Sequence, residues 1–309
     1  CSLRLVLIGF LGSGLSAMGE QGSIQTVAGP LAAEEVGVVL AHEHVLVDFV
    51  GAELVSPDRY NRAEVLAAVT PHIEAARDMG MQLMVECTPA FIGRDPLLLR
   101  ELSERTGVQF VTNTGLYGAV NDKFLPAYAW EETAQELADR WSAEFQDGIE
   151  GTGIKPGFIK SAVDRDADLS PGLAQLDILA EHGVDPSAWI WVHAQGARDE
   201  DVLIAAERGA WISLDGVRPR SLDRHLALCQ KLKDAGYWDQ VLLSHDAGWF
   251  DPAKPGGGEI RGYTLIFEQM LPRLRAAGFS EEELRRVLSV NPAKALTIAV
   301  RELKTSPSE

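Results

Sequence analysis

The sequence predicts an α/β fold in which parallel strands and covering helices form one barrel, and three observations support this. Short apolar runs alternate with amphipathic segments past residue 23. The apolar runs are nearly continuous, as expected for strands buried on both faces. The length of 309 residues is long for an ordinary domain and normal for one α/β barrel. Strands that alternate with helices form βα units, so we expect one barrel domain over residues 23–309.

The expected strands follow one another in order, and each is trailed by a helix-like segment. The first is "VVLAHEHVLVDF" at residues 38–49, followed by the helical "AEVLAAVTPHIEAARDMG". The next are "MQLMVECTP", "VQFVTNTGLYG", "GFIKSAVD", "WIWVHAQG", "GAWISLDGV" and "QVLLSHDAGW". No linker or low-complexity stretch interrupts this series, which favours a single domain.

Residues 1–22 differ from the rest of the chain and resemble a secretory leader. They contain one Arg, an apolar run from Leu5 to Leu11, and small residues ending near Ala17. The run is too short for a membrane span, which needs about 20 apolar residues. The alternative is a non-native or frayed leader, so the location stays open between the cytoplasm and export.

The charge of the chain argues against several classes of partner. There are 28 basic and 45 acidic residues, a formal net charge of −17. Phosphates of nucleic acid would repel such a chain, and no basic patch suits an anionic membrane. The cysteines Cys1, Cys87 and Cys229 show no paired spacing, so neither a disulfide framework nor a zinc knuckle is expected. A small-molecule substrate is the expected partner, and a homodimer is one option for the assembly.

Polar side chains interrupt the apolar runs where a barrel places its active site. His42 and His44 lie two positions apart on the first expected strand, so both point into the barrel and Glu43 points outward. Other runs carry polar residues at or near their ends: Lys160, His193, Asp215 and Asp246. Strand C-termini form the active site of a βα barrel. One buried His is usually a hydrogen-bonded core residue, but this combination of imidazoles, lysine and carboxylate predicts a metal site.

Three other histidines have structural interpretations. His245 adjoins Asp246 and alternates away from it on the strand, so it should face the helices or the rim of the site. His225, within "DRHLAL", is expected on a helix surface. His182, within "LAEHGV", reads as a helix C-terminus, where a His favours the helix dipole.

Several motifs together resemble the phosphotriesterase-related proteins of the amidohydrolase superfamily. They are "GVVLAHEHVLVD", "ECTP", "GRDP", "TGLYGA", "GIEGTGIKPGFIK" and "NPAKAL", and they run from about Gly29 to Leu296. The resemblance implies a TIM-type (β/α)8 barrel and a binuclear metal hydrolase. It implies the following metal ligands: His42, His44 and Asp246 for the more buried ion, carboxylated Lys160 as a bridge, and His193 for the exposed ion.

The resemblance also implies the chemistry. A hydroxide that bridges two divalent ions would attack an ester, lactone or phosphotriester, and Asp246 would take the proton from the attacking water. A neutral buried lysine can form a carbamate with carbon dioxide, and two cations stabilise that anion. Imidazole and oxygen ligands favour zinc, with manganese, cobalt or iron as alternatives.

Three further positions match the family near its substrate or its ligands. Tyr117 and Trp249 would contact the substrate, with packing at the rim as the alternative role. Asp215 would orient the site. Gly216 follows it where the lactonase branch usually carries an Arg, which disfavours lactonase as the specific activity.

One departure concerns the fifth strand, which carries another His in the family. Lys160 and His193 are only 33 positions apart (193 − 160 = 33), room for one βα crossover and not two. We therefore expect seven recognisable strands, with the fifth βα unit missing near residues 168–175. Three explanations compete: the sequence lacks a segment that the molecule has, the gene carries a deletion, or another segment such as Leu5–Leu11 substitutes. The alternative function is a catalytically silent barrel that binds a metal or small molecule without turnover.

Overall fold

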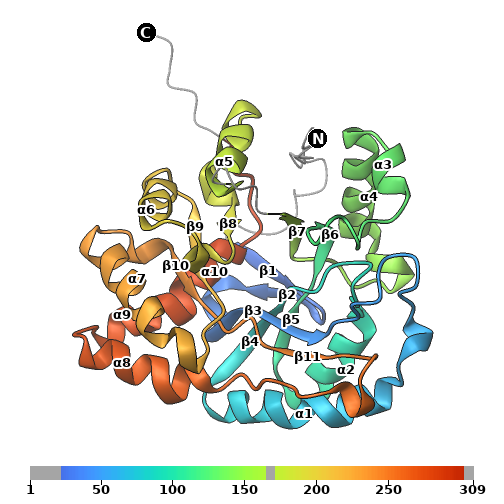
Figure 1. The fold of residues 1–309 in the computed structure, drawn as a ribbon, viewed down its shortest axis with the longest axis horizontal. Helices are drawn as coiled ribbons and strands as arrows, with labels where there is room; N and C mark the ends of the chain where they lie inside the picture. Colours follow the sequence, from blue (N-terminus) through green and yellow to red (C-terminus); the bar gives the residue numbers. More distant parts are fainter. Residues whose placement is uncertain (1–21, 165–170, 303–309) are drawn as a thin grey trace.

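The computed structural model describes residues 22–164 and 171–302, and strands at its centre are surrounded by helices (Figure 1). The expected leader therefore lies outside the described residues. The strands are β1 (Ser23–Thr26), β2 (Gly29–Ala32), β3 (Val38–Leu46), β4 (Met81–Glu86), β5 (Gln109–Val111), β6 (Asn113–Gly118), β7 (Phe158–Val163), β8 (Ile190–Trp191), β9 (Trp211–Leu214), β10 (Val241–Leu243) and β11 (Gly248–Phe250).

Helices follow most of the strands, as the alternating pattern predicts. The α-helices are α1 (Arg62–Asp78), α2 (Pro96–Thr106), α3 (Tyr128–Glu131), α4 (Ala134–Asp147), α5 (Pro171–Glu181), α6 (Asp199–Glu207), α7 (Leu222–Asp234), α8 (Leu271–Ala276), α9 (Glu281–Arg285) and α10 (Asn291–Leu296). None of the helices within the described ranges is long and apolar enough to cross a membrane.

Local sequence explains where helix α2 begins and ends. The Asp95 carboxylate caps it by accepting a hydrogen bond from the Leu98 amide, and Pro96 occupies the first turn, where its missing N–H costs nothing. Gly107 ends the helix in the left-handed conformation at φ 73°. Asp95 and Gly107 thus fix the two ends of this helix.

The barrel strands pair in parallel and keep their expected order. One group is β11-β3-β4-β5, a second is β6-β7 and a third is β10-β9-β8, while β1 and β2 form a separate antiparallel hairpin. The chain beyond β10 joins β3 through two backbone hydrogen bonds, from Asp246 N to His42 O and from His44 N to Ala247 O, each 3.0 Å long. The barrel strands therefore lie side by side in the same circular order in which they follow one another along the chain, as consecutive βα units do.

The expected gap lies between β7 and β8, which do not pair within the described residues. The chain described between them contains α5 and a short 3₁₀ turn at Pro186–Ala188, with no strand. Closure of the barrel on this side is not observed. Residues 165–170 lie outside the described part, so the missing fifth unit stays a prediction.

Candidate metal centre

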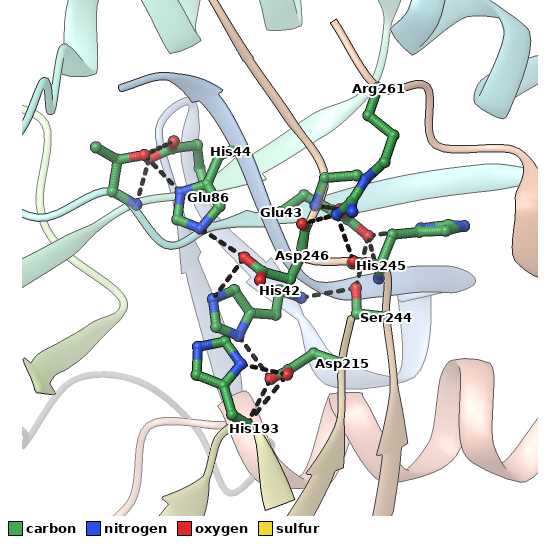
Figure 2. Close-up of polar contacts among 12 residues, drawn as sticks. His42, Glu43, His44, Glu86, His193, Asp215, Ser244, His245, Asp246 and Arg261 are labelled. Carbon is green, nitrogen blue, oxygen red and sulfur yellow. Dashed lines mark hydrogen bonds and ion pairs between the residues drawn. The ribbon is translucent and has the colours of Figure 1, made fainter. Parts of the chain in front are cut away.

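Two imidazoles and a carboxylate converge at the carboxyl end of β3. His42 and His44 project to the same side of this strand, and Asp246 follows β10 beside it (Figure 2). The Nε2 atom of His44 lies 3.2 Å from Asp246 Oδ1, and the Nε2 atom of His42 lies 3.8 Å from the same oxygen. These three side chains offer donor atoms within 4.8 Å of one another. The alternation of a strand thus brings together residues that the sequence singled out.

Asp215 holds the outer nitrogens of two of the imidazoles. Its carboxylate lies 2.8 Å from His42 Nδ1 and 2.6 Å from His193 Nδ1, and the two rings stack with centroids 5.1 Å apart (Figure 2). Burial alone would raise the pKa of Asp215, but the charge of His42 and the hydrogen bond from His193 hold that pKa well below its usual value. An ionised carboxylate only accepts hydrogen bonds, so both Nδ1 atoms carry a proton and both Nε2 atoms lie on the side of their rings away from Asp215.

His44 is oriented by a different pair of side chains. Its Nδ1 atom lies 2.8 Å from Thr88 Oγ1, and the Thr88 hydroxyl donates to Glu86 Oε1 at 2.5 Å. A hydroxyl has one proton, so the Thr88 oxygen accepts from His44 Nδ1–H, and Nε2 again faces Asp246. Sequence reasoning did not single out Glu86 or Thr88. They lie in the quoted "ECTP" motif, and a glutamate inside a buried strand was the available signal.

Lys160 lies in β7, opposite Gly115 of β6. The residue is buried at 6% exposure, and within residues 22–164 and 171–302 its ammonium forms no ion pair. Its charge is nonetheless felt at the imidazoles: burial is the largest cause of the lowered pKa of His42, and Lys160 is the second. A Cβ atom on Gly115 would lie 2.1 Å from the Lys160 carbonyl oxygen, so glycine is what lets the two strands approach here.

Three residues around this centre adopt the left-handed backbone conformation, which is unfavourable for residues other than glycine. His193 has φ 57°, Asp246 has φ 49° and Trp249 has φ 54°. Such left-handed residues cluster at functional sites, where the surrounding structure stabilises them. The side chain of His193 is 52% exposed, which leaves its Nε2 side accessible. Burial lowers its pKa, but the hydrogen bond to Asp215 and that carboxylate's charge raise it above the usual value.

His245 and Glu43 form a pair on the opposite face of the strands, as the alternation predicts. His245 Nδ1 lies 2.7 Å from Glu43 Oε1, and His245 Nε2 accepts a hydrogen bond from the backbone N–H of Ile266 at 3.0 Å. Ile266 starts the π-helical turn Ile266–Met270, so the prediction that His245 faces the helices is confirmed. Glu43 also accepts from the Ser244 hydroxyl at 2.7 Å. This pair links β3 to the end of β10.

The expectation for His225 was wrong. This residue is buried in α7, and its Nδ1 and Nε2 atoms lie 2.8 and 3.0 Å from the carbonyl oxygens of Ser221 and Asp215. The apolar face of an amphipathic helix can hold a His whose nitrogens find backbone partners, and the printed pattern "DRHLAL" does not reveal those partners. His182 directly follows the last residue of α5, as predicted.

Two aromatic residues lie beside the polar centre. Trp249 lies in the short strand β11, and its ring meets His44 edge-on at 5.9 Å between centroids. Tyr117 of β6 packs against Phe124, with ring centroids 5.9 Å apart. Both belong to one apolar cluster with Val47 and Ile92. Burial and the nearby charge of Asp246 raise the pKa of Tyr117. The site thus has an apolar wall.

Comparison with known proteins gives one consistent result. Residues 22–171 and 162–296 match the phosphotriesterase family. An aryldialkylphosphatase from Saccharolobus solfataricus is 28% identical over 305 residues, covering 84% of this chain and 95% of the relative. The family match is divided into two pieces that overlap at residues 162–171, and this overlap includes the first part of the expected junction at residues 168–175.

Solved structures agree with the sequence relatives. The organophosphorus hydrolase from Deinococcus radiodurans superposes with a TM-score of 0.75 at 27% identity, covering 92% of this chain and 100% of that structure. A variant of a PTE-like lactonase from the same organism gives a TM-score of 0.76 at 26% identity, covering 88% and 99%. These likenesses extend over nearly the whole described chain.

Proposed function

Because this chain belongs to the phosphotriesterase family of the amidohydrolase superfamily, we propose that it is a metal-dependent hydrolase that cleaves an ester, lactone or phosphotriester. One observation carries the proposal: the Nε2 atoms of His42 and His44 both face Asp246 Oδ1, at 3.8 and 3.2 Å. Two imidazole nitrogens, each oriented by another side chain, together with a carboxylate oxygen form the donor set of a catalytic metal site.

The described donor atoms of His42, His44 and Asp246 lie close enough together to hold one divalent ion, and we propose a second ion beside it. His42, His44 and Asp246 would hold the more buried ion. Lys160 and His193 would hold the second ion, with Lys160 as a carbamate. Formation of the carbamate joins the neutral Lys160 nitrogen to carbon dioxide and releases one proton. A buried lysine with no ion pair among the described residues supports this assignment, since such a charge is otherwise costly. Nitrogen and oxygen donors favour zinc, with manganese, cobalt and iron as alternatives.

A divalent ion bound here would polarise the substrate's carbonyl or phosphoryl oxygen and lower the pKa of water. The chain supplies the remaining functions. Burial would raise the pKa of Asp246, but the hydrogen bond with His44 and the charge of His42 outweigh burial and keep the carboxyl ionised at neutral pH. It can therefore accept the proton of the attacking water. Asp215 and Thr88 keep the imidazoles in one tautomer, and Tyr117 and Trp249 offer an apolar wall for the substrate.

Metal analysis combined with turnover tests the proposal. The purified chain is loaded with zinc, manganese or cobalt, and aryl esters, lactones and phosphotriesters are offered. We expect close to two ions per chain and hydrolysis that rises as hydroxide becomes available. The proposal is refuted if the protein holds two ions but hydrolyses none of these substrates with zinc, manganese or cobalt.

A second candidate is a barrel that binds a metal or small molecule without turnover. It is favoured by the gap between β7 and β8, where the described residues contain no strand. In that case the outer ion would have only Lys160 and His193 as protein ligands. Zero or one ion per chain together with no turnover would favour this candidate.

A further inference from the structure

Glu43 lies between the two histidine ligands of β3, on the opposite face of the strand, and is 0% exposed. The Ser244 hydroxyl donates to its Oε1 atom at 2.7 Å, and the backbone N–H and Nδ1 of His245 donate to the same oxygen at 2.9 and 2.7 Å. The backbone N–H of Ala247 donates to Oε2 at 2.9 Å. One carboxylate thus holds three of four consecutive residues, and the fourth is Asp246.

Further contacts fix the direction of these hydrogen bonds. The Nε2 atom of His245 accepts from the backbone N–H of Ile266 at 3.0 Å, so Nδ1 carries the proton and donates to Glu43. The Ser244 oxygen accepts from the backbone N–H of His42 at 2.9 Å, and its own hydrogen is given to Glu43. All these contacts bring a hydrogen to the carboxylate, which accepts at both oxygens. An amide at this position would place its NH2 group against one of the donors.

The direction of the Asp246 side chain is not set by the alternation of a strand. Asp246 lies between β10 and β11, and its φ is 49°. This left-handed conformation is unfavourable for a residue other than glycine and persists where the surroundings impose it. Its own N–H is bonded to His42 O at 3.0 Å, and Glu43 holds the residues on both sides of it. Figure 2 shows the Asp246 carboxylate pointing away from Glu43, with Oδ1 3.2 Å from His44 Nε2.

We propose that Glu43 is a positioning residue: its carboxylate holds the backbone around Asp246 in the left-handed conformation that turns the Asp246 side chain toward His42 and His44. The consequence for catalysis rests on the proposed hydrolase function, in which Asp246 binds an ion and accepts a proton. The role differs from that of Asp215, which orients imidazole rings. A misplacement of about 1 Å can lower a rate about 100-fold, so the effect should appear in metal affinity and kcat.

A double-mutant cycle tests whether Glu43 acts through Asp246. Zinc affinity is measured by competition with a chromogenic chelator in the full-length parental chain, in Glu43→Gln, in Asp246→Asn and in the double variant. We expect Glu43→Gln to lower the affinity about tenfold in the parental chain, and by less than about twofold when Asp246→Asn is already present. Equal losses in both backgrounds overturn the proposal. Ser244→Ala removes one donor to Glu43, should show the same coupling with a smaller loss, and replaces Glu43→Gln in every measurement if that variant does not fold.

Asp95→Asn is the matched control. Asp95 is also a buried carboxylate, and it accepts from the backbone N–H of Leu98 at 3.0 Å and from the Tyr60 hydroxyl at 2.7 Å, but it caps helix α2. This variant should lose stability while keeping the parental zinc affinity and kcat. On an aryl ester, metal-loaded Glu43→Gln should lose about tenfold or more in kcat with KM changed by less than about twofold. A loss confined to KM contradicts the positioning role.

Crystal structures separate this inference from the proposed function, because they require neither metal nor turnover. In the metal-free parental chain, Asp246 should keep its positive φ and its contact with His44. In metal-free Glu43→Gln, Asp246 should leave the left-handed region, or its carboxylate should move beyond hydrogen-bond distance of His44. If the chain binds no metal but this change is seen, the hydrolase proposal fails and the positioning role of Glu43 stands. The same placement of Asp246 in both structures overturns that role.

Discussion

Asp215 fixes the tautomers of two histidines, and it does so from the Nδ1 side of their rings. By accepting hydrogen bonds at 2.8 and 2.6 Å it keeps the Nδ1 protons of His42 and His193 on its own side. It also accepts from the Ser213 hydroxyl at 3.0 Å, so its oxygens are well satisfied in a buried place. Both rings therefore present Nε2 toward the centre.

Asp215→Asn tests this positioning role. The amide keeps the shape but has lost its charge and can donate, so the tautomers of His42 and His193 are no longer fixed. We expect metal affinity to fall about 10–100-fold, measured by competition with a chromogenic chelator. Asp223→Asn, an exposed site on α7, is the matched control. Unchanged affinity in Asp215→Asn with a folded protein would contradict the role.

Asp246 is expected to act directly on the attacking water. Asp246→Asn should abolish turnover while the far-ultraviolet circular dichroism stays unchanged, because an amide cannot take up the proton. The measurement is kcat on an aryl ester in metal-loaded samples. A variant with near-parental kcat would remove Asp246 from the mechanism.

Lys160 is expected to act through a carbamate. Lys160→Ala should lose activity and regain part of it when a short carboxylate such as acetate or propionate is added, because a free carboxylate can replace the bridging anion. Activity is measured as a function of carboxylate concentration, with the protein that keeps Lys160 as the control. The carbamate assignment is disfavoured when the variant stays inactive at every concentration.

At the scale of elements, the close approach of β6 and β7 positions that lysine. Gly115 has φ 109°, and the nearest atoms to its missing Cβ all belong to the backbone of Lys160. Backbone cannot move aside as a flexible side chain can. The pairing of these two strands therefore depends on a glycine at one register position, Gly115 opposite Lys160.

Gly115→Ala should destabilise the fold by more than about 1 kcal/mol and also weaken metal binding, because it adds a clash to the strain of a positive φ. Urea unfolding measures the first effect and chelator competition the second. Gly107→Ala is the matched control, since Gly107 has φ 73° but open space around its Cβ position. If both variants lose the same free energy of unfolding, the strain of a positive φ alone explains the loss and the clash with Lys160 contributes nothing.

At the scale of the whole molecule, the proposed ligands connect strand groups that share no ladder. His42 and His44 lie in β3, Lys160 lies in β7, and His193 follows β8. Because β7 and β8 do not pair in the described residues, ions held from both sides would join the two edges of the gap. Metal binding and global stability should then be coupled.

Removal of metal should consequently lower the melting temperature by several degrees, and adding back zinc should restore it. Calorimetry on chelated and reloaded protein measures this change. His182→Ala, outside the site after α5, should show the same shift as the unchanged chain. A melting temperature that is identical with and without bound metal would show that the site and the gap are independent.

The sequence by itself determined the order of the strands, the family and the side chains at the centre. Two-residue alternation on one strand is enough to place His42 and His44 on one face and Glu43 on the other, because strand geometry is local. The single strand expected at "QVLLSHDAGW" is instead two, β10 and β11, because Asp246 takes a left-handed conformation between them.

Only the tertiary structure decided which groups form hydrogen bonds with those side chains. The Asp215 contact with His42, the relay from His44 through Thr88 to Glu86, and the burial of His225 join residues from different strands and turns. Periodicity reports which face a residue occupies, whereas hydrogen bonds depend on distances of a few ångströms that are set by packing of the whole chain.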